Sequence, residues 1–95
     1  MNQLTKQELL DLKPGDCIRK EHNYPGIPEE YKNYHEYKVI SNRNNQIRVE
    51  FKYQNRICRT RVTINNTFRE DGTQVLYPSQ TKIEYRFYKT EPLNF

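Results

Sequence analysis

The chain has 95 residues, 34% of them hydrophobic and 29% charged, and a formal net charge of +4 at pH 7. This length predicts a single domain over residues 1–95, and eight tyrosines and four phenylalanines supply large rings for a folded core. No apolar run approaches the ~18 residues of a membrane span. The N-terminus lacks the apolar segment of a secretory signal, so we expect a cytoplasmic protein with no membrane partner.

The first predicted element is a short helix that begins at Thr5. Thr5 and Glu8 have the spacing of a capping box, in which each side chain bonds the backbone N–H of the other residue. Leu9 then faces the core. The helix must end before Pro14, which disfavours helical backbone in the preceding residue, and Gly15 favours a turn at the same place.

Residues 16–20 follow as a short stretch that is compatible with a strand. Residues 21–33 contain two prolines and a glycine, which predict a long loop. Loops of this length are uncommon in compact domains unless they have a function. The loop carries Tyr24 and Tyr31 and ends beside Tyr34, so aromatic side chains are concentrated in and near it.

From residue 34 onward the sequence predicts an antiparallel meander of five strands, over residues 35–40, 46–53, 56–64, 73–77 and 81–88. Apolar and polar residues alternate in most of these stretches, as they do in strands with one buried face. The alternation places Tyr37, Tyr53 and Tyr85 on inward faces, where we expect them in the core. The predicted fold class is therefore α+β and mostly β, with one short N-terminal helix before the five strands.

The register of one hairpin follows from its turn. A two-residue loop made by Gln54 and Asn55 would pair the inward residues of the two flanking strands with one another. The resulting inward pairs are Tyr53 with Arg56, Phe51 with Cys58, Val49 with Thr60, and Ile47 with Val62. A slip of one residue would instead turn Arg59 and Arg61 toward the core.

The outward face of this hairpin brings two arginines together. Its predicted pairs are Glu50 with Arg59, Lys52 with Ile57, and Arg48 with Arg61. We expect Glu50 and Arg59 to form a cross-strand ion pair worth ~0.2–1 kcal/mol, whereas Arg48 and Arg61 should repel one another by a similar amount. A phosphate or carboxylate between the two guanidinium groups would remove this repulsion, because guanidinium binds such groups in bidentate geometry.

The positive charge of the chain is concentrated in this hairpin. Residues 43–61 contain six basic residues and one acidic residue, whereas the rest of the chain has ten basic and eleven acidic residues. Five of the six are arginine, which favours anion binding over the alternative, a charged edge strand that only prevents aggregation. The candidate anion-binding residues are Arg43, Arg48, Lys52, Arg59, Arg61, Lys82 and Arg86. The candidate stacking or interface residues are Tyr24, Tyr31, Tyr34 and Tyr88.

Residues 12–18, Leu-Lys-Pro-Gly-Asp-Cys-Ile, resemble the L-x-P-G-D-x-[VI] entry that often opens SH3-like small β-barrels. The resemblance implies that this turn leads into the first strand of an SH3-like, partly open barrel. The long loop at residues 21–33 departs from the usual compactness of that family. Such barrels bind nucleic acids, peptides and proteins alike, so the resemblance indicates a fold and not a function.

The sequence favours a non-enzymatic module that binds nucleic acid or another phosphate-bearing ligand through the arginine-rich hairpin. One alternative is a small phage or mobile-element protein that occludes a host protein, because Tyr and Arg are equally suited to protein interfaces. A second alternative is a metal-independent ribonuclease, in which His22, His35, Glu36 and nearby tyrosines would supply acid–base groups. Nothing in the sequence indicates the oligomeric state.

No cofactor or metal is expected. The only cysteines, Cys17 and Cys58, lie far apart, and the chain has no close ligand pair of the C-x2-C type. It also has neither a Gly-rich phosphate loop nor a dinucleotide-binding fingerprint. In a reducing compartment we expect both cysteines to be free thiols.

Overall fold

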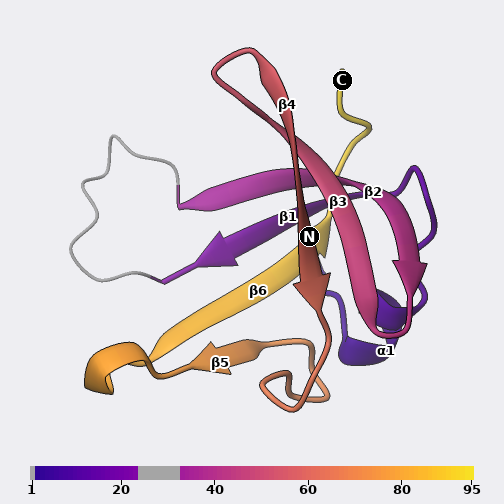
Figure 1. The fold of residues 1–95 in the computed structure, drawn as a ribbon. Coiled ribbons are helices and arrows are strands. Elements are labelled where there is room, and N and C mark those ends of the chain that lie inside the picture. Colours follow the sequence, from indigo (N-terminus) through magenta and orange to yellow (C-terminus); the bar gives the residue numbers. More distant parts are fainter. Residues whose placement is uncertain (1, 24–32) are drawn as a thin grey trace.

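The computed structural model describes residues 2–23 and 33–95, and Figure 1 shows their arrangement. Tyr24 and Tyr31, two of the predicted stacking residues, lie outside the described residues. The elements in chain order are the helix α1 (Lys6–Leu10), the strands β1 (Cys17–His22), β2 (Tyr34–Arg43), β3 (Gln46–Tyr53), β4 (Arg56–Thr63) and β5 (Gln74–Leu76), the 3-10 turn η1 (Pro78–Gln80), and the strand β6 (Ile83–Lys89).

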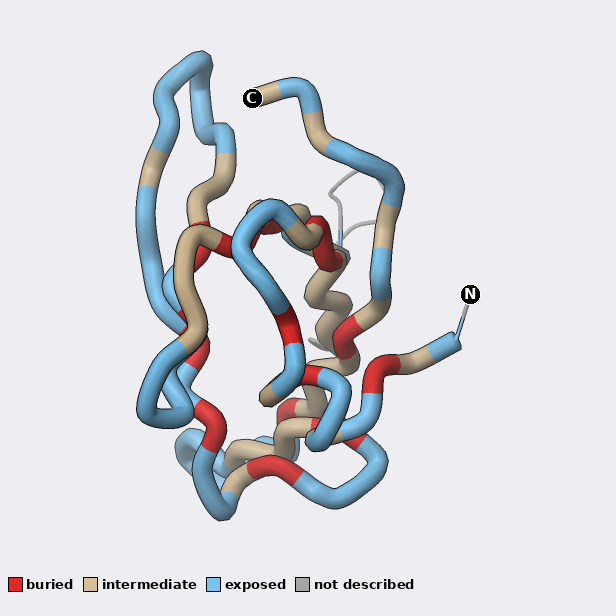
Figure 2. Tube along the Cα trace, turned by 90° about the vertical axis from the view of Figure 1, so that its right-hand side faces the viewer, coloured by how far each residue is buried: buried red, intermediate tan, exposed pale blue. Residues whose placement is uncertain are grey.

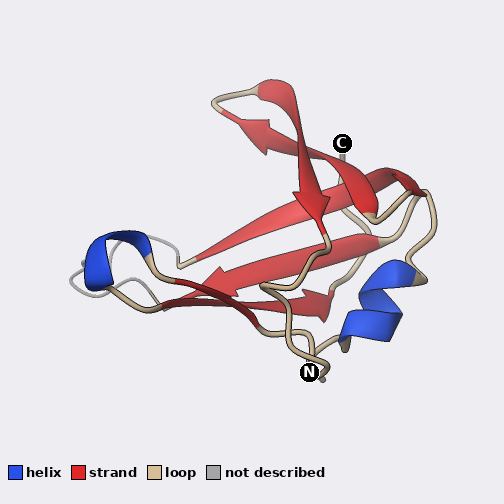
Figure 3. Ribbon diagram, turned by 60° about the horizontal axis from the view of Figure 1, so that its bottom comes forward, coloured by secondary structure: helices blue, strands red, loops and turns tan. Residues whose placement is uncertain are grey.

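The predicted capping box at the start of α1 is confirmed. The Thr5 side chain accepts a hydrogen bond from the backbone N–H of Glu8, and the Glu8 carboxylate accepts one from the backbone N–H of Thr5. These bonds satisfy two of the N–H groups that the first turn of a helix leaves unpaired. Leu9 is fully buried, as the sequence predicted. Figure 3 places α1 and η1 at opposite ends of the sheet.

The strands form one antiparallel sheet in the order β4-β3-β2-β1-β6-β5. The predicted count of five strands is wrong, because β1 is a full strand of six residues that pairs with β2 on one side and β6 on the other. The expected simple meander is therefore interrupted: β6 returns to pair with β1. The sheet does not close, since β4 and β5 are its edges, and the SH3-like relationship stays a prediction.

The core lies between α1 and the inward face of the sheet. Its fully buried side chains include Phe87, Leu9, Ile18, Ile47, Val39 and Val49. In Figure 2 the buried segments gather in the lower part of the molecule, whereas the loop at the top is exposed. Burying side chains of this size contributes roughly 1.5–3 kcal/mol each, so the sheet and the helix stabilise one another through these contacts.

The predicted register of the β3–β4 hairpin is confirmed at every pair from Ile47 with Val62 to Tyr53 with Arg56. Gln54 and Asn55 both have positive φ, +49° and +62°. Two successive residues with positive φ make the turn whose twist matches that of the flanking strands. A second turn of this kind, at Asn44 and Asn45, joins β2 to β3.

The outer half of this hairpin projects beyond the core. Ile47, Val49 and Val62 near its base are buried, but Tyr53 is 61% exposed and Ile57 is 50% exposed. The expectation that Tyr53 belongs to the core is therefore wrong. Alternation assigns a residue to a face, but no other helix or strand of the described residues covers that face at the tip. Tyr37 is buried, as expected, and Tyr85 packs half-buried against the core.

The strand β2 contains a β-bulge. Val39 pairs with Val49, and the next pair joins Ser41 to Arg48, so Ile40 has no partner of its own. A bulge inserts one extra residue and places two successive side chains on the same side. Past the bulge, Asn42 turns toward α1, and its side-chain amide donates to the backbone carbonyls of residues 9, 10 and 12. These bonds satisfy carbonyls at the C-terminal end of the helix.

Candidate anion-binding site

The outward face of β2, β3 and β4 holds two adjoining pockets. One, of about 240 Å³, is lined by Ile40, Arg48, Arg59, Thr60 and Arg61. The other, of about 430 Å³, is lined by Ile40, Ser41, Arg43, Asn44, Gln46 and Arg48. Because Ile40 and Arg48 line both, the two pockets adjoin, and we treat them together as one region of the surface. We call it the arginine groove and define it by Arg43, Arg48, Arg59 and Arg61.

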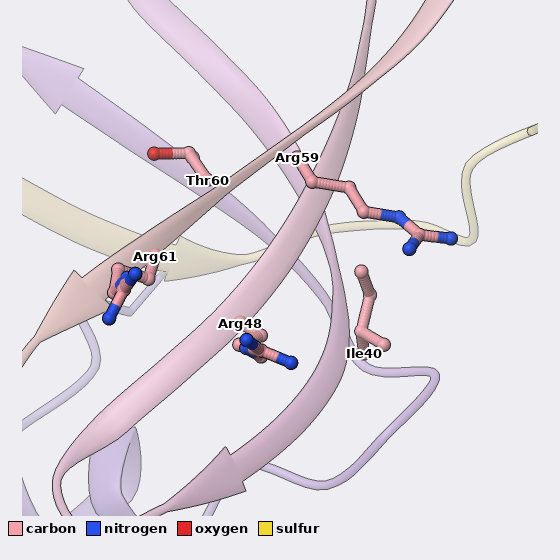
Figure 4. Close-up of a pocket in the computed structure, with 5 residues that line it drawn as sticks. All are labelled: Ile40, Arg48, Arg59, Thr60 and Arg61. Carbon is pink, nitrogen blue, oxygen red and sulfur yellow. The ribbon is translucent and has the colours of Figure 1, made fainter.

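The backbone explains how these side chains come together. The confirmed register sets Arg48 directly opposite Arg61 and leaves Arg59 two residues along β4, on the same face. Figure 4 shows Arg48 and Arg59 reaching out from neighbouring strands on the side where Ile40 lies. The bulge at Ile40 gives the groove an apolar lining residue on an otherwise polar face.

The cations of the groove have no acidic partner among residues 2–23 and 33–95. The ion pairs found there involve other residues, on β1, β2, β6 and the segments beside them. Glu50 stands opposite Arg59, but the ion pair expected between them is not formed. Arg61 donates only a long hydrogen bond, 3.4 Å, to the neutral amide of Gln46. The groove thus keeps a concentrated positive charge.

The structure does not bring Lys82 and Arg86 to this groove. β6 is separated from β3 by β2 and β1, and both cations pair with Glu84 on or beside β6 itself. These contacts hold the pKa of Glu84 below its usual value, chiefly through the bond from Lys82. The two residues therefore lie on an ion-paired surface that is separate from the arginine groove.

The predicted anion-binding residue Lys52 lies on the outward face of β3 but nearer the exposed tip, where it pairs with Ile57 in the register.

The predicted stacking residues Tyr34 and Tyr88 lie on the outward face of β2 and β6, on either side of β1. The Arg19 guanidinium sits over the Tyr34 ring, 4.1 Å from its centroid. This pair is a cation–π contact, and it lies away from the arginine groove.

The inward face carries a second cationic group that the sequence analysis did not assemble. Lys20 and His22 on β1 and His35 on β2 lie together, and the rings of the two histidines are 6.0 Å apart. The two histidines considered for a ribonuclease are thus close to one another. Glu36, also considered for it, faces the opposite side of the sheet and pairs with Arg19. The ribonuclease reading stays a prediction.

The sequence pattern indicates part of this cluster of Lys20, His22 and His35. Ile18, Lys20 and His22 alternate with polar residues along β1, and a strand at residues 17–22 places them on one face. What the sequence does not reveal is that β1 lies between β2 and β6. Within the described residues, no group of three or more His, Cys, Asp or Glu side chains could hold a metal ion, and both cysteines are free.

In the described part of the chain, no helix is long and apolar enough to cross a membrane. Comparisons of the sequence with models of known protein families and with curated proteins, and of the fold with solved structures, found no match.

Proposed function

We propose that the arginine groove binds the phosphate backbone of nucleic acid and that the protein is a binding module rather than an enzyme. The observation that carries this proposal is that Arg48, Arg59 and Arg61 line one pocket with no carboxylate among the described residues to neutralise them. Phosphate contacts from arginine supply most of the sequence-independent affinity of proteins for nucleic acids.

In the free protein, the guanidinium groups of Arg48 and Arg61 repel one another. Arg48 and Arg61 are direct cross-strand partners, and two like charges in that position destabilise a sheet by ~0.2–1 kcal/mol. A bound phosphate converts this repulsion into two attractive contacts. Its oxygens match the planar donor fork of guanidinium, and charge-assisted bonds of this kind are about twice as strong as neutral ones.

The extent of the groove favours a polymer over a single small anion. The two pockets run from Arg59 and Arg61 on β4, across Arg48 on β3, to Arg43 at the end of β2. Cations spread over three strands can each contact a different phosphate of one strand. A single mononucleotide would satisfy only one or two of them.

The test is the binding of fluorescent single- and double-stranded oligonucleotides across a series of salt concentrations. Wild-type affinity should fall steeply with salt, because each neutralised phosphate releases counterions. The variant Arg59→Gln/Arg61→Gln should bind more than about tenfold more weakly at 0.1 M salt, with a shallower salt dependence. The matched control Lys82→Gln/Arg86→Gln removes the same charge from the ion-paired surface beside Glu84 and should bind within about twofold of wild type. Negligible binding by wild type even at low salt would refute the proposal.

A second candidate function, the occlusion of another protein, is favoured by the exposed hairpin tip. Tyr53 and Ile57 are large side chains left open to solvent beside Lys52 and Arg56, and aromatic and arginine side chains are enriched where proteins bind one another. Recovery of one stoichiometric protein partner, resistant to nuclease treatment, would select this function. The cytoplasmic location and the SH3-like relationship stay predictions.

A further inference from the structure

We infer that Lys20, His22 and His35 form a second anion site, on the inward face of the sheet, which binds the phosphate group of a small molecule. This face is opposite to the one that carries the arginine groove, because residues on a strand alternate between the two faces. The inference therefore does not depend on the proposed function.

The three side chains come from adjacent strands. Lys20 is the direct cross-strand partner of His35, and His22 lies next to them at the end of β1. The centroids of the two imidazole rings are 6.0 Å apart, with an angle of 33° between the rings. Donor-to-acceptor distances to a phosphate oxygen are about 2.8 Å, so two rings at this separation can both contact one tetrahedral group.

The surroundings of the cluster are aromatic. The Lys20 ammonium group lies over the Tyr85 ring, 4.1 Å from its centroid, and the His35 ring stacks on that of Tyr37 at 6.2 Å. His22 meets the edge of Tyr85 at 6.4 Å. These rings shield part of the cluster from water, since Lys20 and His22 are half-buried, while His35 is exposed. Where water is excluded, the attraction between a cation and an anion is stronger.

No acidic side chain faces the cluster from the strands that form it. The groups that face it are Lys20 and His22 from β1, His35 and Tyr37 from β2, and Tyr85 from β6. The acidic residues of the same strands, Glu21, Glu36 and Glu84, alternate onto the opposite face. Among the described residues, Lys20 and His35 take part in no ion pair. Lys20 thus supplies positive charge, and His35 adds to it when it is protonated, without an ion-pair partner among the described residues.

The pKa values agree with this geometry. Burial lowers the pKa of Lys20, and burial together with the charge of Lys20 lowers that of His35. The pKa of His22 is lowered by burial and then by the charges of His35 and Lys20. A bound phosphate would oppose these effects, because a nearby negative charge favours the protonated forms. Anion binding and protonation should therefore strengthen one another.

The test uses the imidazole signals in NMR spectra, which report on this site alone because the chain has only two histidines. Inorganic sulfate serves as a tetrahedral dianion whose charge stays constant between pH 5 and 8. Sulfate should move the titration of both imidazoles to higher pH. It should also bind at least about tenfold more tightly at pH 5.5 than at pH 8.0, since each protonated ring adds a charge-assisted hydrogen bond.

The deciding variant is Lys20→Met, which keeps an unbranched apolar stem against Tyr85 while it removes the charge. It should weaken sulfate binding at pH 5.5 about tenfold. The matched control Lys82→Met, on the other face, should leave the sulfate-induced shifts of the imidazole signals unchanged. Arg59→Gln/Arg61→Gln should also leave these shifts unchanged, because sulfate bound in the arginine groove does not contact the imidazoles. If Lys20→Met does not fold, His35→Asn takes its place, with His22 as the reporter.

Adenosine 5′-monophosphate and adenosine distinguish the sources of the phosphate group. Tighter binding of the monophosphate than of sulfate would indicate a nucleotide, and equal binding would indicate free oxyanions; both support the inference. It is overturned if adenosine alone binds as well as its monophosphate, if sulfate shifts neither imidazole, or if only the arginine variant abolishes the shift.

Discussion

Two surfaces on the outward face of the sheet carry the same kinds of cationic side chain in different settings. In the arginine groove, the guanidinium groups of Arg48, Arg59 and Arg61 have no carboxylate partner among the described residues. On β6, Lys82 and Arg86 share the carboxylate of Glu84. Both regions are basic in the sequence, but only on β6 is each cation paired with a carboxylate.

If the arginine groove binds anions as proposed, anion binding should depend on the pairing of the cations as well as on their number. An ion pair leaves little charge for a ligand, because the ligand must compete with a carboxylate already in place. Exposed pairs also contribute little to stability, typically 0–1 kcal/mol. The proposed function therefore predicts weaker anion binding by the ion-paired surface of β6 than by the arginine groove.

Of the three changes that test this comparison, the largest effect is expected from giving the groove its own carboxylate. Gln46 already accepts a hydrogen bond from Arg61 at 3.4 Å, so Gln46→Glu places a negative charge beside that guanidinium with almost no change in shape. We expect nucleic-acid affinity at 0.1 M salt to fall roughly fivefold, and the salt slope to lose about one unit. Fluorescence anisotropy across a salt series measures both quantities. An unchanged salt slope would contradict the comparison.

A smaller effect should follow from freeing the cations of β6. Glu84→Gln removes the shared carboxylate and leaves Lys82 and Arg86 unpaired, so we expect nucleic-acid affinity to rise about twofold. In the same variant, the stability of the fold should also depend less on pH in the acidic range. The pKa of Glu84 is lower in the folded state than in the unfolded chain. The ionised Glu84 carboxylate therefore stabilises the fold above the unfolded-state pKa, and this contribution is lost as the pH falls through the folded-state pKa. Denaturation of wild type and variant from pH 7 to pH 3 should show a weaker loss of stability in Glu84→Gln.

The smallest effect is expected at the hairpin tip. Tyr53 is 61% exposed, so Tyr53→Ser should change the free energy of unfolding by less than about 0.5 kcal/mol. Nucleic-acid affinity should stay within about twofold if charge in the groove carries binding. A large loss of affinity would instead show that an aromatic contact at the tip dominates, and loss of a protein partner would support the second candidate function.

The local parts of the fold were predictable because the residues that determine them are close in sequence. A two-residue turn and strict alternation fixed the full register of the β3–β4 hairpin, and the spacing of Thr5 and Glu8 fixed the start of α1. The like-charge pair of Arg48 and Arg61 followed from that register. Each of these features rests on neighbours along the chain or across one short loop.

The features that the sequence did not predict depend on contacts between distant segments. The position of β1 between β2 and β6 made six strands instead of five and brought Lys20, His22 and His35 together. Tyr53 was assigned to the core because alternation identifies its face, but alternation cannot show whether another element reaches that face. Lys82 and Arg86 were wrongly assigned to the hairpin site because the sequence does not reveal the order of the strands in the sheet.

The bulge at Ile40 determines which side chains of β2 lie on each face of the sheet. In a regular strand, Val39 and Asn42 would lie on opposite faces, but the extra residue lets Val39 enter the core while the Asn42 amide reaches the carbonyls of α1. The same irregularity sets Ile40 into the outward groove. Deleting one residue here would restore the regular register, so that either Asn42 loses its contact with α1 or Val39 leaves the core. Helix docking and the shape of the groove therefore depend on the same extra residue.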